Sequence, residues 1–359
     1  MPITTYLNRP AWKLESQELR ISVLQCGGHI GEIVLKGGSE VNPLWVPPVP
    51  TIDSDQYDPA VHGAIYGTSA EARLLSGLVG HNLCFPYWGD PSKAEAAAGM
   101  TFHGETGIRR WSLLKETPDQ LSLEVRLPES DMSFRRMIRV KGATVQVDSI
   151  AANQSAWDRP FGWCEHVTFG PPFLESGVTR FDASADKGFV TGQSGGDNFP
   201  WPTAKSGAGN AATLFNLHEF ARVEHSDLVN SYLLRPDRPW GWFAAFHRKY
   251  SLLIGYLFQR EHYPWLNIWE NNDKRRVTRG MEFSNTPHHG TMKALIKSAE
   301  MWGAPTYEWL DGRSLVTKSF TVFVSRVPAD FRGTQDIQVS SGEVEIIEIG
   351  GGRRFQVTI

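Results

Sequence analysis

Short runs in which apolar and polar residues alternate dominate the chain. Residues 121–127 (Leu-Ser-Leu-Glu-Val-Arg-Leu) alternate without a break, and residues 19–25 and 31–35 are similar runs on either side of a Gly-Gly-His turn. A period of two places successive side chains on opposite faces of a strand, so these runs predict half-buried β-strands. Comparable patterns predict further strands at 134–140, 143–152, 231–234, 241–247, 251–259, 266–270, 319–327, 343–349 and 354–359.

Helical patterns are few. Residues 292–301 form the only convincing helix, and a shorter helical piece is expected at 94–98. The rest of 51–100 is expected to be loop, and residues 184–212, rich in Gly, Ser, Ala, Asp and Asn, are expected to form a long surface excursion. Many short strands with few short helices indicate an all-β fold, a large antiparallel β-sandwich. We expect it to occupy residues 1–359 as a single domain.

Composition and charge exclude several classes of partner. The 359 residues are 41% hydrophobic and 21% charged, which is enough apolar material for a core. A net charge of −3, from 36 basic and 39 acidic residues, argues against nucleic acid or an anionic membrane as a partner. The N-terminus lacks a signal-peptide pattern, and no apolar run is long enough to span a membrane. We therefore expect a cytoplasmic protein, monomeric or homodimeric.

Two residues are candidates for proton transfer. His166 lies in an apolar, aromatic stretch that is followed by Gly-Pro-Pro, which places its imidazole near a strand end. Histidine titrates near neutrality and is suited to acid catalysis, although a core histidine bonded to a backbone carbonyl is the alternative interpretation. Glu282 lies between Met281 and Phe283 and is a candidate base if it faces a cleft; a position facing solvent is equally open.

Several other side chains suit a polyhydroxylated ligand. His103 and Arg109 occupy a glycine-containing loop, and the Arg109 guanidinium offers a fork of donors to vicinal hydroxyls, unless it is a surface ion-pair partner. Trp88 is a candidate stacking surface, with a structural role as the alternative.

No cofactor is expected. A metal site built from residues such as His81, His103, Glu105, His288 and His289 is disfavoured, because no His-x-His or HExxH spacing places two ligands on one face. The three cysteines have no metal-type spacing, the glycine clusters follow no phosphate-loop or dinucleotide pattern, and no Gly-x-Ser-x-Gly elbow is present.

Together these stretches resemble the aldose 1-epimerase (galactose mutarotase-like) superfamily. The resemblance rests on His103-Gly104 followed by Arg109-Arg110-Trp111, on His166-Val167-Thr168-Phe169, and on Gly280-Met281-Glu282-Phe283 with the strand 266–272 before it. Residues 80–89 (Gly-His-Asn-Leu-Cys-Phe-Pro-Tyr-Trp-Gly) are similar to a segment of the hexose-6-phosphate epimerase branch. However, neither the arginine typical of that branch nor the Asn-Arg pair of the galactose branch is present at the corresponding place.

The resemblance implies a galactose mutarotase-like supersandwich and an aldose 1-epimerase that interconverts the α and β anomers of a hexose by ring opening. It implies His166 as acid and Glu282 as base, and it implies contacts to a small carbohydrate from His103, Arg109, Trp88, His81 and Trp269, with no metal or cofactor. Three alternatives stay open: a hexose-6-phosphate 1-epimerase, a non-catalytic carbohydrate-binding protein on the same fold, and a polysaccharide lyase or glycosidase.

Overall fold

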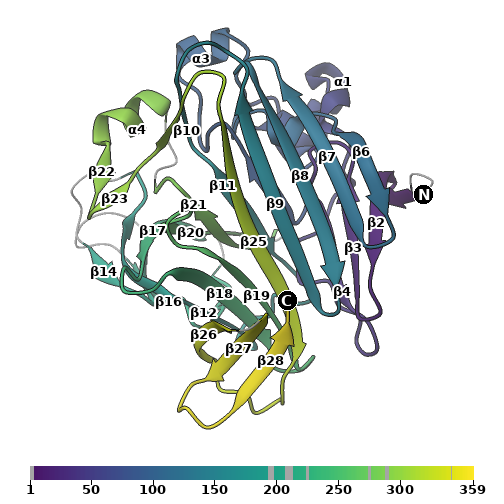
Figure 1. Cartoon of the computed structure of the whole chain (residues 1–359), viewed down its shortest axis with the longest axis vertical. Helices are drawn as coiled ribbons and strands as arrows, with labels where there is room; N and C mark the ends of the chain where they lie inside the picture. The colour runs from purple at the N-terminus through teal and green to yellow at the C-terminus, as the bar shows by residue number, and fades with distance from the viewer. Residues whose placement is uncertain are drawn as a thin grey trace.

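Two large β-sheets packed face to face make up most of the molecule (Figure 1). The computed structural model describes residues 4–192, 198–206, 213–223, 226–273, 276–287, 291–340 and 342–359. Within these residues, the larger sheet has eleven strands in the order β1-β2-β3-β4-β5-β11-β21-β20-β17-β13-β14. Their bounds are β1 Thr4–Tyr6, β2 Arg9–Glu15, β3 Leu19–Leu24, β4 Ile30–Leu35, β5 His81–Cys84, β11 Cys164–Phe169, β13 Ala185–Val190, β14 Phe199–Pro200, β17 Ser226–Leu234, β20 Trp265–Asn272 and β21 Arg279–Ser284.

The second sheet has eight strands in the described part of the chain, in the order β12-β18-β19-β25-β9-β8-β7-β6. Their bounds are β6 Ser112–Thr117, β7 Gln120–Leu127, β8 Met132–Lys141, β9 Thr144–Asn153, β12 Thr179–Ala183, β18 Trp240–His247, β19 Leu252–Gln259 and β25 Leu315–Arg326. Neighbouring strands pair antiparallel in both sheets, for example β11 with β21 and β8 with β9. This confirms the predicted all-β antiparallel sandwich.

The core lies between the two sheets and is rich in aromatic rings. Phe283 on β21 stacks on Phe258 of β19 with ring centroids 4.2 Å apart, and Tyr256 and Phe320 pack around the same ring. Such aromatic pairs bury large apolar areas and add specific ring geometry. Because side chains alternate along a strand, burying Phe283 in the sandwich turns its neighbour Glu282 to the opposite face of the sheet.

A small third sheet at the C-terminal end covers the outer face of the second sheet. It contains β26 Thr334–Ser340, β27 Glu343–Glu348 and β28 Arg354–Thr358. Ile337, Val344 and Ile346 from this sheet form a separate apolar cluster with residues that include Trp242 and Leu253. The remaining short strands are β10 Arg159–Phe161, β15 Thr203–Ser206, β16 Thr213–Asn216, β22 Glu300–Met301, β23 Ala304–Pro305 and β24 Glu308–Leu310.

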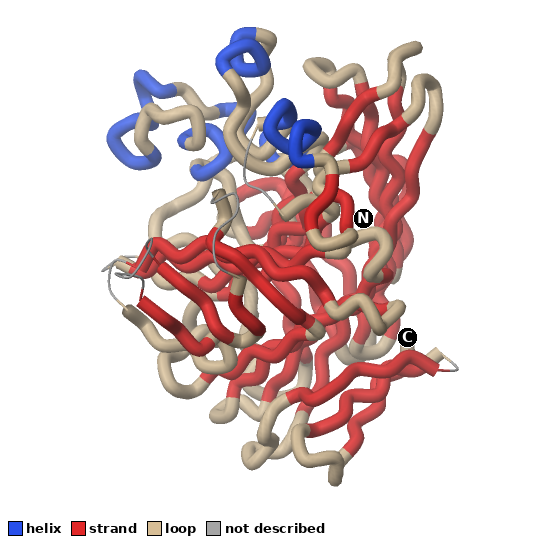
Figure 2. The backbone as a smooth tube through the Cα atoms, turned by 90° about the vertical axis from the view of Figure 1, so that its left-hand side faces the viewer, coloured by secondary structure: helices blue, strands red, loops and turns tan. Residues whose placement is uncertain are grey.

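The helices gather at one end of the sheets (Figures 1 and 2). They are α1 Pro59–Tyr66, α2 Ala72–Leu75, α3 Lys93–Ala97 and α4 Met292–Ser298, with 3-10 turns η1 Ser54–Gln56 and η2 Thr106–Ile108. The predicted helix at 292–301 is confirmed but ends at Ser298, because Ala299 takes a left-handed φ of 53°. The helix expected at 94–98 corresponds to α3, which begins with a capping box between Ser92 and Glu95.

Two segments differ from the sequence-based prediction. Residues 51–100, expected to be mostly loop, contain α1 and α2 as well as β5. The excursion expected at 184–212 contains β13, β14 and β15, and its residues 193–197 and 207–212 lie outside the described residues. Among the described helices, none is long and apolar enough to cross a membrane.

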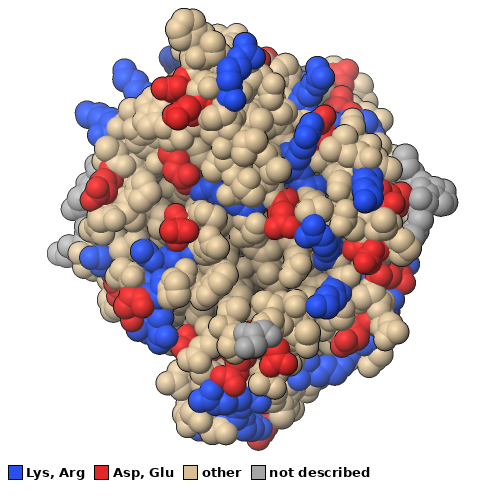
Figure 3. Space-filling model, in the orientation of Figure 1, with Lys and Arg blue, Asp and Glu red and all other residues tan. Residues whose placement is uncertain are grey.

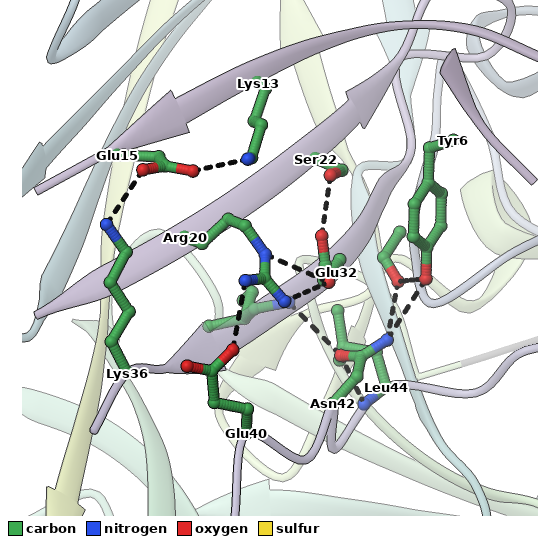
Figure 4. Close-up of polar contacts among 12 residues, drawn as sticks. Tyr6, Lys13, Glu15, Arg20, Ser22, Glu32, Lys36, Glu40, Asn42 and Leu44 are labelled. Atoms are coloured by element: carbon green, nitrogen blue, oxygen red, sulfur yellow. Dashed lines mark hydrogen bonds and ion pairs between the residues drawn. The ribbon is translucent and has the colours of Figure 1, made fainter. Parts of the chain in front are cut away.

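A polar network fastens β3 and β4 of the larger sheet to the segment that leads toward β5. Asn42 donates to Gly31 O at 2.9 Å and accepts from the Ile33 amide at 3.2 Å, while Glu32 pairs with Arg20 at 3.0 Å (Figure 4). Beyond Asn42, the Trp45 amide donates to Thr168 O at 2.8 Å, which ties the proline-rich segment to β11. Elsewhere on the surface, the face in Figure 3 carries acidic and basic side chains intermixed.

Candidate active site

His166 and Glu282 lie directly opposite each other on neighbouring antiparallel strands, β11 and β21. The His166 Nε2 atom is 2.9 Å from Glu282 Oε1, and the two residues are 5% and 0% exposed. The same row continues to Asn82 on β5 at one side and to Asn267 on β20 at the other. Two candidate proton carriers that are far apart in the sequence are therefore in contact on one face of the sheet.

A cavity of about 230 Å³ opens beside this pair. A pocket of this type needs roughly 10–15 Å³ to hold one water molecule, so the space is large enough for a small ligand. Its lining includes His166, Glu282, His103, Trp88 and Trp269, which are five of the seven predicted site residues. The other lining residues are Glu71, Leu74, Leu75, Leu78, Phe102, Val229, Asn271 and Arg276.

Trp269 forms one wall because Gly280 leaves room for its indole. The two residues pair directly across β20 and β21, and a Cβ atom built on Gly280 would lie 2.0 Å from Trp269 Nε1 and 2.9 Å from Glu282 Oε1. Both atoms are buried, and neither has a hydrogen-bond partner in the described part of the chain, although Oε1 lies 2.9 Å from His166 Nε2 as an ion-pair contact. A donor and an acceptor thus converge above Gly280, next to the cavity. Buried polar atoms normally find partners, so the Trp269 N–H is available for a ligand next to the His166–Glu282 contact.

His103 and Trp88 form the opposite wall. The His103 ring lies 5.6 Å from that of His166 and stacks with the Trp88 indole at a centroid distance of 6.4 Å. His103 Nδ1 accepts a hydrogen bond from the Gly89 amide at 3.0 Å, which fixes the orientation of its ring. His103 and Gly104 both have positive φ values, 61° and 78°, and a Cβ on Gly104 would lie 2.4 Å from Phe85 O. This tight turn requires glycine and carries the histidine to the cavity.

Two cysteines lie next to the proton-transfer pair on the same face of the sheet. Cys164 Sγ is 3.8 Å from Glu282 Oε2, and Cys84 lies directly opposite Cys164 on β5. Burial raises the pKa of both thiols, that of Cys164 well above its usual value. The thiols therefore stay neutral near pH 7, and Cys164 serves as a weak donor to the carboxylate of Glu282.

His81 and Arg109, the other two predicted sugar contacts, lie outside this cavity. His81 is opposite Val167, so it points to the core side of the sheet, where Nε2 is 2.8 Å from Glu165 Oε2; burial lowers the pKa of His81. Arg109 pairs with Glu129 at 2.6 Å and with Glu105 at 3.4 Å. The structure thus corrects the placement of both residues: His81 belongs to a buried polar network, and Arg109 is an ion-pair partner.

The sequence patterns did not predict the wall contributed by α2 or the polar group of Asn271 and Arg276. Glu71, Leu74, Leu75 and Leu78 line the cavity, and their spacing matches one face of a helix, which was the available signal. Burial and the nearby Asp90 raise the pKa of Glu71, while Arg276 opposes that rise. His288 and His289, weighed as metal ligands, lie outside the described residues.

Comparison with known proteins identifies the fold. No protein-family model and no curated protein sequence matches the chain. Among solved structures, it is similar to a proposed aldose 1-epimerase from Klebsiella pneumoniae (TM-score 0.65, 14% identity, covering 90% of this chain and 80% of that one). It is also similar to a galactose mutarotase related enzyme from Lactobacillus acidophilus (TM-score 0.58, 12% identity, 88% and 98%). A galactose mutarotase-like protein from Lactobacillus casei gives a TM-score of 0.54 at 11% identity, covering 88% and 100%. The two-sheet sandwich that presents His166 and Glu282 is therefore the galactose mutarotase-like fold.

Proposed function

We propose that the protein is an aldose 1-epimerase that uses Glu282 as general base and His166 as general acid. The observation that carries this proposal is the 2.9 Å contact between the two side chains at the edge of a ligand-sized cavity. The fold neighbours described as aldose 1-epimerases or mutarotases add support.

The reaction needs one proton removed and one supplied. Glu282 takes the proton from the anomeric hydroxyl while His166 donates a proton to the ring oxygen; the C1–O5 bond breaks and the C1–O1 bond becomes a carbonyl. Rotation about C1–C2 then presents the other face of the aldehyde. Ring closure returns the proton from Glu282 to the new anomeric hydroxyl and the ring-oxygen proton to His166, so no proton is gained or lost overall. Positioned acid–base groups typically contribute about 10²–10⁴-fold in rate.

The surrounding side chains have matching roles. Trp269 and Trp88 offer flat apolar surfaces to the C–H face of a pyranose. His103, Asn271 and Arg276 offer polar groups to its hydroxyls. We expect these groups to hold the ring so that O1 lies by Glu282 and O5 by His166.

Polarimetry of freshly dissolved α-aldoses tests the proposal. We expect Glu282→Gln and His166→Asn each to lower the enzymatic mutarotation rate by at least about 100-fold while sugar binding by calorimetry is kept. Glu261→Gln, at a carboxylate whose side chain is 78% exposed, is the matched control and should retain full activity. Wild-type rates in both site variants contradict the mechanism, and saturable binding without any anomerisation supports a non-catalytic carbohydrate-binding protein instead.

A phosphorylated hexose is the second candidate substrate, because Arg276 lines the cavity. Glu71 lies in the same lining, and its carboxylate interacts with Arg276. A carboxylate close to the arginine opposes a phosphate dianion, so we favour a neutral sugar. The two candidates separate when kcat/KM is compared for glucose and glucose 6-phosphate.

A further inference from the structure

The two sides of the cavity, one toward β5 and one toward β20, differ in the side chains that line them. The order β5-β11-β21-β20 puts His166 on the β5 side of the pair and Glu282 on the β20 side. Any ligand that bridges the two residues therefore has one end toward β5 and the other toward β20.

The β5 side is mainly apolar. Leu74 packs with Phe102 and Ile108 in a buried cluster, and Leu74 and Phe102 both line the cavity. Leu78, 5% exposed, lines it just before β5 begins. The nearest polar group on this strand, Asn82 Oδ1, is covered: a Cβ on Gly107 would lie 2.7 Å from it and 2.9 Å from Leu74 Cδ1. His103, which is polar, also lines the cavity on this side.

The β20 side carries polar groups next to the Trp269 indole and Val229. Asn271 belongs to β20, and Arg276 belongs to the turn between β20 and β21. The Arg276 amide donates to Asp273 Oδ1 at 2.6 Å and its carbonyl accepts from the Asp273 amide at 2.9 Å, which anchors that residue at the cavity edge. Glu71, at the start of α2, interacts with Arg276.

This asymmetry sets the orientation of a pyranose in the proposed reaction. The ring oxygen bonds to C1 and C5, so a ring whose O5 meets His166 extends C5 and its substituent toward the β5 side. The C2 and C3 hydroxyls then extend toward Asn271 and Arg276. The substituent on C5 thus faces the leucine and phenylalanine side chains.

We propose that the cavity selects 6-deoxyhexoses, whose C5 carries a methyl group, over hexoses whose C5 carries a hydroxymethyl group. The proposal rests on the proposed function, which fixes the orientation of the ring. A hydroxyl placed among Leu74, Leu78 and Phe102 loses water without gaining a hydrogen-bond partner from these three side chains, whereas a methyl group gains apolar contact with them. An apolar pocket rejects an added hydroxyl by up to about 100-fold, so we expect a 10- to 100-fold preference.

Matched sugar pairs that differ only at C6 test this selectivity. Mutarotation is measured for galactose and 6-deoxygalactose, and for glucose and 6-deoxyglucose, with kcat/KM as the readout. Calorimetry with Glu282→Gln measures the same preference as binding, independently of turnover. In the variant Leu75→Gln, at a half-buried lining residue, the preference for the deoxy sugar should fall at least threefold. Leu114→Gln, on β6 at 51% exposure, is the control for the same chemical change and should leave the preference intact.

The outcomes separate the two proposals. The proposed selectivity is supported if the wild type prefers the deoxy sugar in binding or turnover and this preference falls in Leu75→Gln. The preference of the wild type is measured without the variant, so it counts even if Leu75→Gln alters stability. Equal or better use of the 6-hydroxy sugar in both pairs overturns it while leaving the epimerase proposal intact. A deoxy preference in binding with no anomerisation of any sugar overturns the epimerase proposal alone, and no binding of any of the four sugars overturns both.

Discussion

Gly280 makes a specific prediction, because the structure leaves no space for a side chain there. An added Cβ would lie 2.0 Å from both Cδ1 and Nε1 of the Trp269 indole. Real Cβ atoms do not approach other atoms so closely, so in Gly280→Ala the indole must leave its position. The cavity is the adjacent open space, and an indole that rotates into it blocks the ligand.

The magnitude follows from the costs of overpacking. Forcing an extra methyl into a packed site costs about 1–3 kcal/mol, and we expect the free energy of unfolding of Gly280→Ala to fall by that amount. We expect kcat/KM for mutarotation to fall more than tenfold. Gly162→Ala is the matched control: its added Cβ would lie 3.4 Å from the nearest atom, Thr286 Cγ2, and both effects should be small.

A double-mutant cycle tests the cause. Unfolding in urea is followed by circular dichroism for the wild type, Gly280→Ala, Trp269→Ala and the double variant. If the indole is what the new methyl strikes, Gly280→Ala costs less than about 0.5 kcal/mol on the Trp269→Ala background, because the coupling between the two sites is lost. An equal cost on both backgrounds, or a Gly280→Ala variant with wild-type stability and activity, refutes this explanation.

Three further predictions concern the buried polar groups. Burial lowers the pKa of His29 to about 3, so as the pH falls this histidine is protonated in the unfolded chain before it is protonated in the folded protein. We therefore expect the free energy of unfolding to drop by about 2 kcal/mol between pH 7.5 and pH 5. Urea titrations at the two pH values should show a smaller drop in the variant His29→Asn. Arg136 contacts Glu165 at 2.5 Å inside the sandwich. Arg136→Ala should lower the free energy of unfolding in urea by about 3–5 kcal/mol, and the double variant Arg136→Ala with Glu165→Gln should lower it less, because no buried charge is left unpaired. Equal losses in the single and double variants contradict this explanation. All three cysteine thiols are buried, and burial raises the pKa of each. A thiol reagent at pH 8 should therefore label them only as fast as the chain unfolds. Rapid labelling of the native protein contradicts this burial.

Much of the fold was predictable because strand patterns are local. The alternation at 121–127 corresponds to β7 (Gln120–Leu127), and the runs at 134–140 and 143–152 correspond to β8 and β9. Helix α2 was not predicted: Glu71, Leu74, Leu75 and Leu78 have helical spacing, but the helix itself spans only four residues within a loop-like sequence. Its contribution to the cavity comes from tertiary packing on Phe102 and Ile108, which no local pattern contains.

The sequence indicated which residues belong to the candidate site better than it indicated which face of the sheet each side chain lies on. His166 and Glu282 were singled out by residue type and setting, yet their contact depends on the register between β11 and β21. His81 shows the limit: every residue of β5 is buried, so no alternation indicated which side chains face the cavity. A shift of one residue in a strand reverses the face, and pairing with Val167 rather than His166 turned His81 into the core.

One structure tests the central claim most directly: crystals of Glu282→Gln soaked with an aldose. We predict a pyranose in the cavity beside Trp269, with its anomeric oxygen within hydrogen-bond distance of residue 282 and its ring oxygen within hydrogen-bond distance of His166 Nε2. A sugar bound with C1 turned away from these two side chains, or bound only elsewhere on the protein, contradicts it.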